Sequence, residues 1–410
     1  MDEDPNSPPH HARRYTAHGD SIDRPIHRRG VLRAGATAAA LGLAGCLSLR
    51  TRPLPDPAVL EAEPERADRG GATPSADRTP TGSVHVVGAT PEQYDTIQAA
   101  FDAAAPGDLV NVTGSYDGSD ETWPVVSETV LTVEADGQLP GIEVPSGSDG
   151  IVFDVDNRRP PGPVLRGVSI TGGARGIVLR GTKFPKLHNC LVRGCSGVAY
   201  AFEDTFEADG ETYRTGTNSA ELYGCTAVRA GEAGLKTDYQ THSIVLENCR
   251  MLHSGGFGAY FDGPANCVVR GGQYEDNADA GVFARAAESV SVRDAYVEAN
   301  GKRRGSHAAN LVAKNCRETL VEGCYFNGLG TPYAVRFLGN GGSENPTVRN
   351  CRFKAHARSN VRTDVEDTDL DRVAGNVDPD SGATRIRNYG TVVGPTGEGV
   401  NLERTRGRDP

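Results

Sequence analysis

Apolar and polar residues alternate in short runs along most of the chain after residue 164, and glycine or asparagine separates the runs. The stretch CRMLHSGGFGAYFDG, Cys249 to Gly263, is one example, with too much glycine for a helix. Similar phrases return about every 23 residues. Alternation over about four to six residues predicts short β-strands, and a period of this length predicts stacked coils, because a single coil cannot bury its inward face alone.

A small residue recurs at one place in each coil. Cysteine holds most of these places, and eight of the nine cysteines lie beyond Cys46. Stacked, parallel side chains suit disulfide geometry poorly, so we predict an inward ladder of small apolar residues, with disulfides as the alternative in an exported protein. The spacing of cysteine and histidine matches no zinc motif. The ladder positions are Cys190, Cys225, Cys249, Gly272, Ala295, Cys324 and Cys351.

A different segment precedes the coils. The stretch YDTIQAAFDAAAPGDLVNVTGSY, Tyr94 to Tyr116, pairs a short amphipathic pattern with the apolar run PGDLVNV. Together with the repeats, it resembles the opening of right-handed parallel β-helix proteins of the pectin lyase-like superfamily. The resemblance covers residues 83–390 and implies an all-β, right-handed parallel β-helix with a short N-terminal capping helix. The superfamily includes lyases, hydrolases, epimerases and non-catalytic members, so the resemblance leaves the activity open.

The first 46 residues have the layout of an export signal. Arg28 and Arg29 precede a weakly apolar run that is too short to span a bilayer. The segment resembles a twin-arginine signal, and its end, Leu43 to Cys46, resembles a lipobox in which Cys46 is lipidated. An ordinary cleaved signal with a chance cysteine is the alternative. We therefore expect an extracellular protein held to the outer face of the cell membrane by a lipid anchor only.

Two further segments lack any hydrophobic period. Residues 47–82 are rich in Pro, Asp, Glu and Arg and predict a disordered linker, and residues 391–410 predict a disordered tail. This leaves residues 83–390 as a single β-helix domain, which we expect to be a monomer. The formal net charge of −11 argues against a nucleic-acid partner, because phosphate binding needs a basic surface.

The strand after each Gly or Asn corner carries the candidate chemistry. Alternation places the first residue after the corner inward and the next outward. The expected inward residues are Ile177, Val198, Leu235, Ala259, Val282, Leu311, Val335 and Val361. The expected first outward row is Val178, Ala199, Lys236, Tyr260, Phe283, Val312, Arg336 and Arg362. The expected second outward row is Arg180, Ala201, Asp238, Asp262, Arg285, Lys314, Leu338 and Asp364.

The middle of these rows predicts a catalytic group made of Asp238, Asp262, Arg285 and Lys314. Two carboxylates one coil apart could be the acid and base of a glycoside hydrolase, with repulsion raising one pKa. They could instead bind Ca²⁺ while Arg285 or Lys314 abstracts a proton, as in a polysaccharide lyase. The third interpretation is a solvated ladder of opposite charges without catalysis.

Neighbouring residues of the first row are the candidates for substrate binding. Aromatic faces stack on sugar rings, and exposed aromatics stand out in a chain that has few of them. The predicted substrate-binding residues are Lys236, Tyr260, Phe283 and Arg336. Two insertions, Glu203 to Asn218 and Asn300 to His307, are expected to wall a groove beside them.

The sequence therefore predicts a cell-surface β-helix that binds and cleaves an acidic polysaccharide by a lyase or glycoside-hydrolase mechanism. The alternative is a non-catalytic module that binds glycans or spaces the cell envelope. The paired acidic side chains suggest Ca²⁺ as the single cofactor.

Overall fold

The structure is a computed structural model. It describes residues 82–88, 93–114, 116–135, 141–155, 160–208, 211–214, 216–303, 307–339 and 346–363, and then 368–369, 373–374, 376, 384–388, 392–393 and 400–404. The predicted signal residues Arg28, Arg29 and Cys46 lie outside the described residues, as does almost all of the predicted linker.

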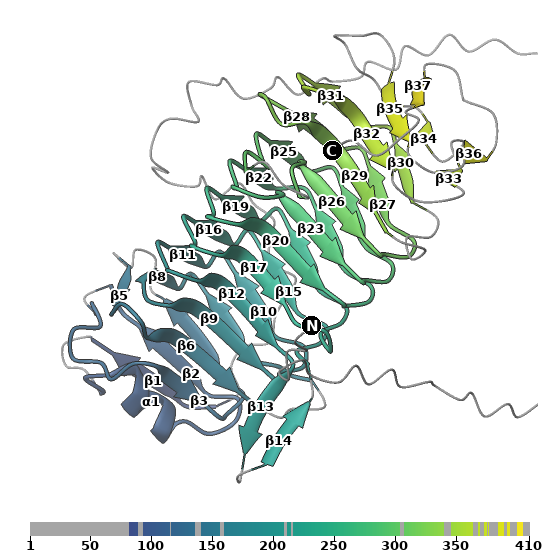
Figure 1. The fold of residues 1–410 in the computed structure, drawn as a ribbon. Coiled ribbons are helices and arrows are strands. Elements are labelled where there is room, and N and C mark those ends of the chain that lie inside the picture. Colours follow the sequence, from purple (N-terminus) through teal and green to yellow (C-terminus); the bar gives the residue numbers. More distant parts are fainter. Residues whose placement is uncertain are drawn as a thin grey trace, which may run out of the picture. The chain divides into compact units, whose positions relative to one another are not determined.

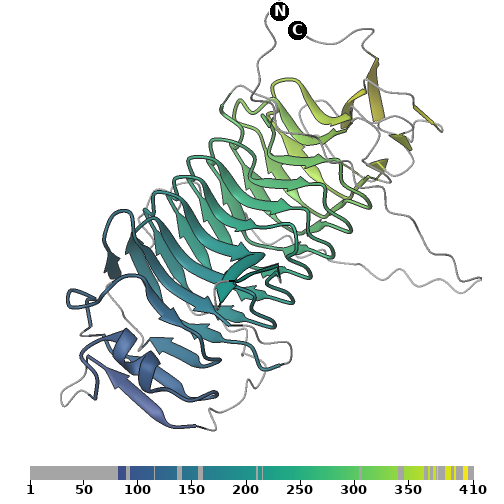
Figure 2. The same ribbon diagram turned by 60° about the horizontal axis from the view of Figure 1, so that its bottom comes forward.

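The chain winds as a right-handed parallel β-helix, which confirms the predicted fold class (Figures 1 and 2). Most coils pass through three sheets in turn, and strands at equivalent places in neighbouring coils pair with each other. We call these sheets 1, 2 and 3, in the order in which a coil enters them. Side chains facing the interior from all three sheets form one continuous hydrophobic core.

Sheet 1 has 12 strands, and its inward positions are almost all Val or Leu. In spatial order they are β1 (Val84–Val87), β2 (Leu109–Val112), β4 (Thr132–Ala135), β7 (Val164–Arg166), β10 (Lys186–His188), β15 (Glu221–Tyr223), β18 (Val245–Glu247), β21 (Val268–Arg270), β24 (Ser291–Arg293), β27 (Leu320–Glu322), β30 (Thr347–Arg349) and β34 (Val373–Ala374).

Sheet 2 has nine strands, which follow sheet 1 after a sharp corner. They are β5 (Ile142–Val144), β8 (Ser169–Gly172), β11 (Leu191–Arg193), β16 (Thr226–Val228), β19 (Arg250–Leu252), β22 (Gln273–Glu275), β25 (Tyr296–Glu298), β28 (Tyr325–Asn327) and β31 (Arg352–Lys354).

Sheet 3 has 12 strands and contains the predicted site. They are β3 (Val125–Ser127), β6 (Asp149–Asp154), β9 (Arg175–Arg180), β12 (Val198–Glu203), β17 (Ala233–Thr237), β20 (Phe257–Asp262), β23 (Val282–Arg285), β26 (Leu311–Lys314), β29 (Tyr333–Leu338), β32 (Ser359–Thr363), β35 (Thr384–Asn388) and β37 (Val400–Arg404).

Two small pairs of strands lie outside the three sheets. The predicted insertion after β12 contains an antiparallel hairpin, β13 (Thr205–Ala208) with β14 (Glu211–Arg214), which projects from the coils in Figure 1. The other pair is β33 (Thr368–Asp369) with β36 (Val392–Val393). Strands β36 and β37 fall within residues 391–410, the segment that we expected to be a disordered tail.

The predicted capping helix is present as α1 (Ile97–Ala103). Thr96 caps its N-terminus by accepting a hydrogen bond from the backbone N–H of Ala99 at 3.1 Å. Ile97, Ala100 and Phe101 are buried against the first coils. Among the described residues, no helix is long and apolar enough to cross a membrane.

Eight cysteines lie beyond Cys46, and five of them form the predicted ladder directly before sheet 2: Cys190, Cys225, Cys249, Cys324 and Cys351. Cys195, Cys267 and Cys316 lie elsewhere in their coils. All eight are buried and none forms a disulfide. The Sγ of Cys225 donates to the Leu187 carbonyl at 3.4 Å, and the Sγ of Cys249 donates to the Leu222 carbonyl at the same distance, so each thiol bonds to the preceding coil. Burial raises the pKa of the Cys195 thiol to about 11 and that of Cys267 to about 12, which keeps these thiols protonated and unreactive.

A second ladder, made of buried asparagine side chains, runs along the corner between sheets 2 and 3. Asn277 donates from Nδ2 to Oδ1 of Asn300 at 2.8 Å, and Asn300 donates to Oδ1 of Asn310 at 3.1 Å. A Cβ at Gly258 would lie 2.9 Å from the Asn277 side-chain nitrogen, and one at Gly281 would lie 2.7 Å from that of Asn300. A larger residue would therefore clash with Asn300 at Gly281, and at Gly258 with the Gly281 carbonyl oxygen, 2.4 Å away, as well as with Asn277.

The corner between sheets 1 and 2 needs a residue with positive φ in every coil. Glycine alternates there with Asn or Asp through eight successive coils. The corner residues are Gly167, Asn189, Gly224, Asn248, Gly271, Asp294, Gly323 and Asn350. Each Asn or Asp side chain covers the next glycine, since a Cβ on Gly271 would lie 2.4 Å from Oδ1 of Asn248.

Candidate functional site

The first predicted outward row is present on sheet 3 over most of its length. Lys236 in β17 pairs with Tyr260 in β20, which pairs with Phe283 in β23. The row continues through Val312 in β26 to Arg336 in β29. The corner spacing therefore predicted correctly which residues of these coils stack.

The predicted register is wrong in one coil, that of β12. Ala201, and not Ala199, pairs with Val178 and Lys236, and Tyr200, in place of Val198, points inward. The Tyr200 hydroxyl donates inside the core to the carbonyl of Cys190 at 2.8 Å. The Tyr200 ring lies in the interior, and the row in this coil is shifted by two residues.

The aromatic residues of the row are not the exposed platform that we expected. Tyr260 is 8% exposed and Phe283 only 2% exposed. The His307 ring, at the end of the second predicted insertion, lies against Phe283, with a distance of 4.6 Å between the ring centroids. Phe257 stacks on Phe283 at 4.8 Å and also contacts the His307 ring. These rings form a small outer core, and a sugar has no access to their faces.

Asp262 and Arg285 form a two-point ion pair across neighbouring coils. The Nε of Arg285 donates to Oδ1 of Asp262 at 2.7 Å, and Nη2 donates to Oδ2. The Tyr260 hydroxyl also donates to this carboxylate, at 3.2 Å. Both charges are thereby compensated, which corresponds to the charge-ladder interpretation at these two positions.

Asp238 lies just after β17 and is not paired with Asp262. Its backbone N–H donates to the Phe202 carbonyl at 2.9 Å, whereas the Asp262 N–H donates to the Thr237 hydroxyl at 3.2 Å. Burial raises the pKa of Asp238, and the nearby charges of Asp204 and Glu203 raise it further. The predicted repulsion at Asp238 thus exists, but it comes from the preceding coil.

The remaining predicted residues, Lys314, Arg336 and Lys236, lie on three different strands of sheet 3. Lys314 ends β26 beside Arg285 and is half-buried, and Arg336 is buried against the Tyr333 ring. Lys236 forms an ion pair with Glu232 at 2.7 Å and lies 5.9 Å from the Tyr260 ring centroid.

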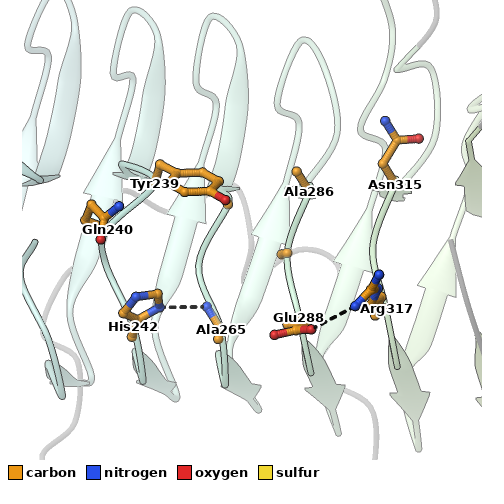
Figure 3. Close-up of a pocket in the computed structure, with 10 residues that line it drawn as sticks. Tyr239, Gln240, His242, Ala265, Ala286, Glu288, Asn315 and Arg317 are labelled. Atoms are coloured by element: carbon orange, nitrogen blue, oxygen red, sulfur yellow. Dashed lines mark hydrogen bonds and ion pairs between the residues drawn. The ribbon is translucent and has the colours of Figure 1, made fainter. Parts of the chain in front are cut away.

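A shallow pocket of about 330 Å³ lies directly beyond the second row, where the chain turns from sheet 3 toward sheet 1 (Figure 3). Each of the four predicted catalytic residues immediately precedes one of its lining residues. We call this pocket the corner groove. It is lined by Tyr239, Gln240, His242, Gly263, Ala265, Ala286, Ala287, Glu288, Asn315 and Arg317.

Tyr239 is the exposed aromatic residue of the corner groove, with 62% of its surface accessible. Its ring lies against the backbone of Gly263 in the next coil, where a Cβ would come within 2.1 Å of a ring carbon. Gly263 also has a φ of +78°. The glycine therefore lets the ring lie flat on the neighbouring coil, with its other face open.

Four small residues form the floor of the corner groove: Gly263, Ala265, Ala286 and Ala287. Polar side chains from successive coils surround this floor (Figure 3). His242 accepts a hydrogen bond at Nδ1 from the Ala265 N–H at 3.2 Å, and Glu288 forms an ion pair with Arg317 at 3.4 Å. Burial lowers the pKa of His242, with Lys183 as a second cause, so the ring is neutral at pH 7. The groove thus combines an aromatic face, amides, a neutral imidazole and an ion pair.

The corner groove was not predicted from the sequence. Tyr239 directly follows Asp238 in a chain with few aromatics, and that signal was available. As for metals, no group of three His, Cys, Asp or Glu within the described residues is arranged to hold an ion. The Ca²⁺ requirement stays a prediction.

Comparisons with known proteins agree with the fold. A protein family described as right handed beta helix region matches residues 213–369. No curated protein sequence matches the chain. Solved structures that resemble it include an alginate lyase from Paenibacillus sp. str. FPU-7, with 12% identity over 76% of this chain and 99% of that chain and a TM-score of 0.43.

Two other similar structures are an epimerase module and a surface adhesin. The mannuronan C-5 epimerase AlgE6 A-module of Azotobacter vinelandii has 16% identity over 76% of this chain and 95% of that chain, with a TM-score of 0.39. PfbA, a surface adhesin of Streptococcus pneumoniae, has 12% identity over 75% of this chain and 86% of that chain, with a TM-score of 0.48. At these identities the likeness concerns the fold alone.

Proposed function

We propose that this protein binds an acidic polysaccharide in the corner groove. The observation that carries the proposal is the open face of Tyr239, held flat on Gly263 above a floor of small residues. Sugar rings present C–H faces that pack on aromatic rings and hydroxyls that need hydrogen-bond partners. Gln240, Asn315 and the Glu288–Arg317 pair supply such partners beside the ring.

The preference for an acidic polymer rests on the cations at one end of the groove. Arg285 and Lys314 are neighbours on adjacent coils, and Arg317 follows Lys314 in the same coil. Arg285 and Arg317 already face carboxylates, whereas Lys314 forms no ion pair with any described residue. An extended chain with one carboxylate per sugar could meet the lysine while its other rings contact Tyr239.

The test uses the full chain and affinity electrophoresis in gels containing polygalacturonate. Tyr239→Ala should weaken binding about tenfold, because the aromatic platform is lost. Leu329→Ala is the matched control, since Leu329 is also exposed, at 58%, but lies outside the groove. Equal retention of the Tyr239→Ala and wild-type proteins would refute binding in the groove.

Cleavage of the bound polymer is a second candidate function, and the raised pKa of Asp238 favours it. A carboxyl group with a raised pKa keeps its proton to a higher pH than an ordinary aspartate does, and this favours a role as a general acid. Release of reducing ends or unsaturated sugars should then fall at least ~100-fold in Asp238→Asn. No release from any uronate polymer by the wild-type protein would leave a binding module, the non-catalytic alternative.

We also propose that the protein is exported and held at the outer face of the cell membrane through a lipid on Cys46. The twin-arginine-like pair and the lipobox-like end of residues 1–46 support this proposal. In cells, Cys46→Ser should move the protein from the membrane fraction to the medium, and replacing Arg28 and Arg29 with Lys should retain it inside. Membrane attachment that survives Cys46→Ser would exclude this anchor.

A further inference from the structure

Two glutamates from neighbouring coils meet on the outer face of sheet 2. Glu275 in β22 is in register with Glu298 in β25, and neighbouring coils are about 4.8 Å apart. Charged side chains in register elsewhere have opposite signs at several places, because like charges side by side repel each other. Examples are Asp149–Arg175, Glu247–Arg270, Asp262–Arg285 and Glu322–Arg349. We call Glu275 and Glu298 the glutamate pair.

The two members of the glutamate pair differ in their hydrogen bonds. Glu298 accepts hydrogen bonds from the Tyr296 hydroxyl and from Nδ2 of Asn327, the latter at 2.8 Å. Oε1 of Glu275 is buried and accepts no hydrogen bond from any described residue. A carboxylate that is shielded from water needs donors to compensate its charge, and within the described structure Glu275 lacks them.

Basic residues near the pair do not neutralise Glu275 either. Arg250 lies on β19, the strand on the other side of β22, but among the described residues it forms no ion pair with Glu275. The Nε of Arg250 is itself buried without a hydrogen-bond partner. Lys302 and His253 both lie beside the Asp276 carboxylate instead, His253 at 3.7 Å. The charge of an ionised Glu275 would therefore face another carboxylate without a bound cation.

These surroundings change the titration of Glu275. Burial raises the pKa of Glu275 to about 7, and the charges of Glu298 and Asp276 add to this effect, whereas Arg250 acts in the opposite direction. Tyr296, the other titratable group on the outer face of β25, is neutral at pH 7, because burial and its bond to Glu298 raise its pKa. Glu275 thus keeps its proton in the folded protein at pH values where an unfolded chain has lost it.

We propose that the glutamate pair is a pH-sensitive contact between two coils of the β-helix. In acidic surroundings the protonated Glu275 donates a hydrogen bond to Glu298, and in alkaline surroundings the two carboxylates repel each other. The contact lies beside the ladder of buried asparagines, since Asn277 and Asn300 follow the two glutamates by two residues and are hydrogen-bonded to each other. The repulsion acts on the same two coils that this bond joins, so the coils should separate locally more often as the pH rises.

Thermal unfolding of the full chain at pH 4 and at pH 8.5 tests the proposal, which does not depend on the identity of the polysaccharide. Because the pKa of Glu275 is higher in the folded protein, its stabilising effect is complete below about pH 4 and is lost as the pH rises through about 7. Glu275→Gln keeps the size of the side chain and removes the charge. Its Tm should exceed that of the wild type by about 2–4 °C at pH 8.5 and should equal it at pH 4.

Hydrogen exchange shows whether this effect is local. At pH 8.5 the backbone amides of β22 and β25 should exchange about tenfold more slowly in Glu275→Gln than in the wild type, because the repulsion between the two coils is gone. At pH 5 the two proteins should exchange alike. Equal exchange at both pH values would mean that ionisation of Glu275 does not weaken the contact, and the proposal would then be wrong.

Glu247→Gln is the matched control. Glu247 is also a half-buried glutamate on the outer face of a sheet, but it is in register with Arg270 and forms an ion pair with it at 3.8 Å. Its substitution removes a favourable pair and should leave the Tm at pH 8.5 unchanged or slightly lower. An equal rise of Tm in both variants would show that the loss of any negative charge stabilises this acidic chain, which would overturn the proposed contact.

Glu298→Gln tests the pairing from the other side. Glutamine keeps a carbonyl oxygen that accepts the bonds from Tyr296 and Asn327, but it has no charge. The titration of Glu275, followed by NMR of carbon-13-labelled glutamate carboxyl groups, should therefore move to lower pH than in the wild type. An unchanged midpoint in this variant, or a wild-type midpoint below pH 5, would contradict a contact in which the two glutamates share one proton.

Discussion

At the scale of single residues, stacking neighbours could be predicted, but their state of charge and exposure could not. The period placed Asp262 beside Arg285 because both follow a corner glycine at the same distance. It could not show that Arg285 binds Asp262 at two points, since that depends on side-chain rotamers. Nor could it show that His307 lies against Phe283, because an inserted loop follows no repeat.

Asp238 gives a prediction about pH at this scale. Its pKa is raised in the folded protein, so the ionised carboxylate destabilises the fold at neutral pH. Asp238→Asn should therefore raise the Tm at pH 7 by about 1–2 °C, a small effect because the group is half-exposed. This increase in Tm should disappear as the pH falls below about 4, where the Asp238 carboxyl of the wild type is protonated in both the folded and the unfolded state.

Thermal unfolding followed by circular dichroism at pH 7 and at pH 3 measures this difference. Asp102→Asn, an exposed carboxylate on α1, is the control and should change the Tm little at either pH. A lower Tm for Asp238→Asn at pH 7 would mean that the carboxylate stabilises the fold instead.

At the scale of elements, the strands and the capping helix were predictable because each obeys a local rule. Alternation marked the strands, and the apolar spacing of Ile97, Ala100 and Phe101 marked α1. The coil of β12 was misplaced because Val198, Ala199 and Tyr200 are all apolar or aromatic, so alternation gave no signal there. In the structure Tyr200 belongs to the core, whereas Val198 belongs to a separate cluster on the outer side of the sheet.

Helix α1 covers the open end of the first coils, and Phe101 anchors it there. The Phe101 ring lies 6.0 Å from that of Phe153 in the core. Phe101→Ala should lower the free energy of unfolding by about 3 kcal/mol and increase self-association, because strand edges become exposed. Urea denaturation and light scattering would measure the two effects.

The control for this prediction is Asp102→Ala, which changes the exposed side of the same helix and should alter stability by less than about 0.5 kcal/mol. Equal losses in the two variants would show that the helix contributes through its own propensity and not through the buried ring.

At the scale of the whole molecule, the sequence period predicted a stack of coils, and the stack explains how the corner groove is formed. The groove is built from residues of successive coils that are far apart in sequence but adjacent at the turn from sheet 3 toward sheet 1. The position of the groove was not predictable, because it depends on how the chain leaves sheet 3, and that segment varies between coils.

The alternation of glycine with Asn or Asp at the corner between sheets 1 and 2 means that coils are interchangeable only in pairs. Excising residues 268–290 would place Asn248 beside Asp294, and the two side chains would clash because a glycine normally follows Asn248 there. Excising residues 245–290 would instead bring Gly224 beside Asp294, an allowed neighbour. We expect the shorter protein to melt at the higher temperature, and the opposite order in a melting experiment would contradict this. Duplication or deletion within the gene should therefore add or remove two coils at a time.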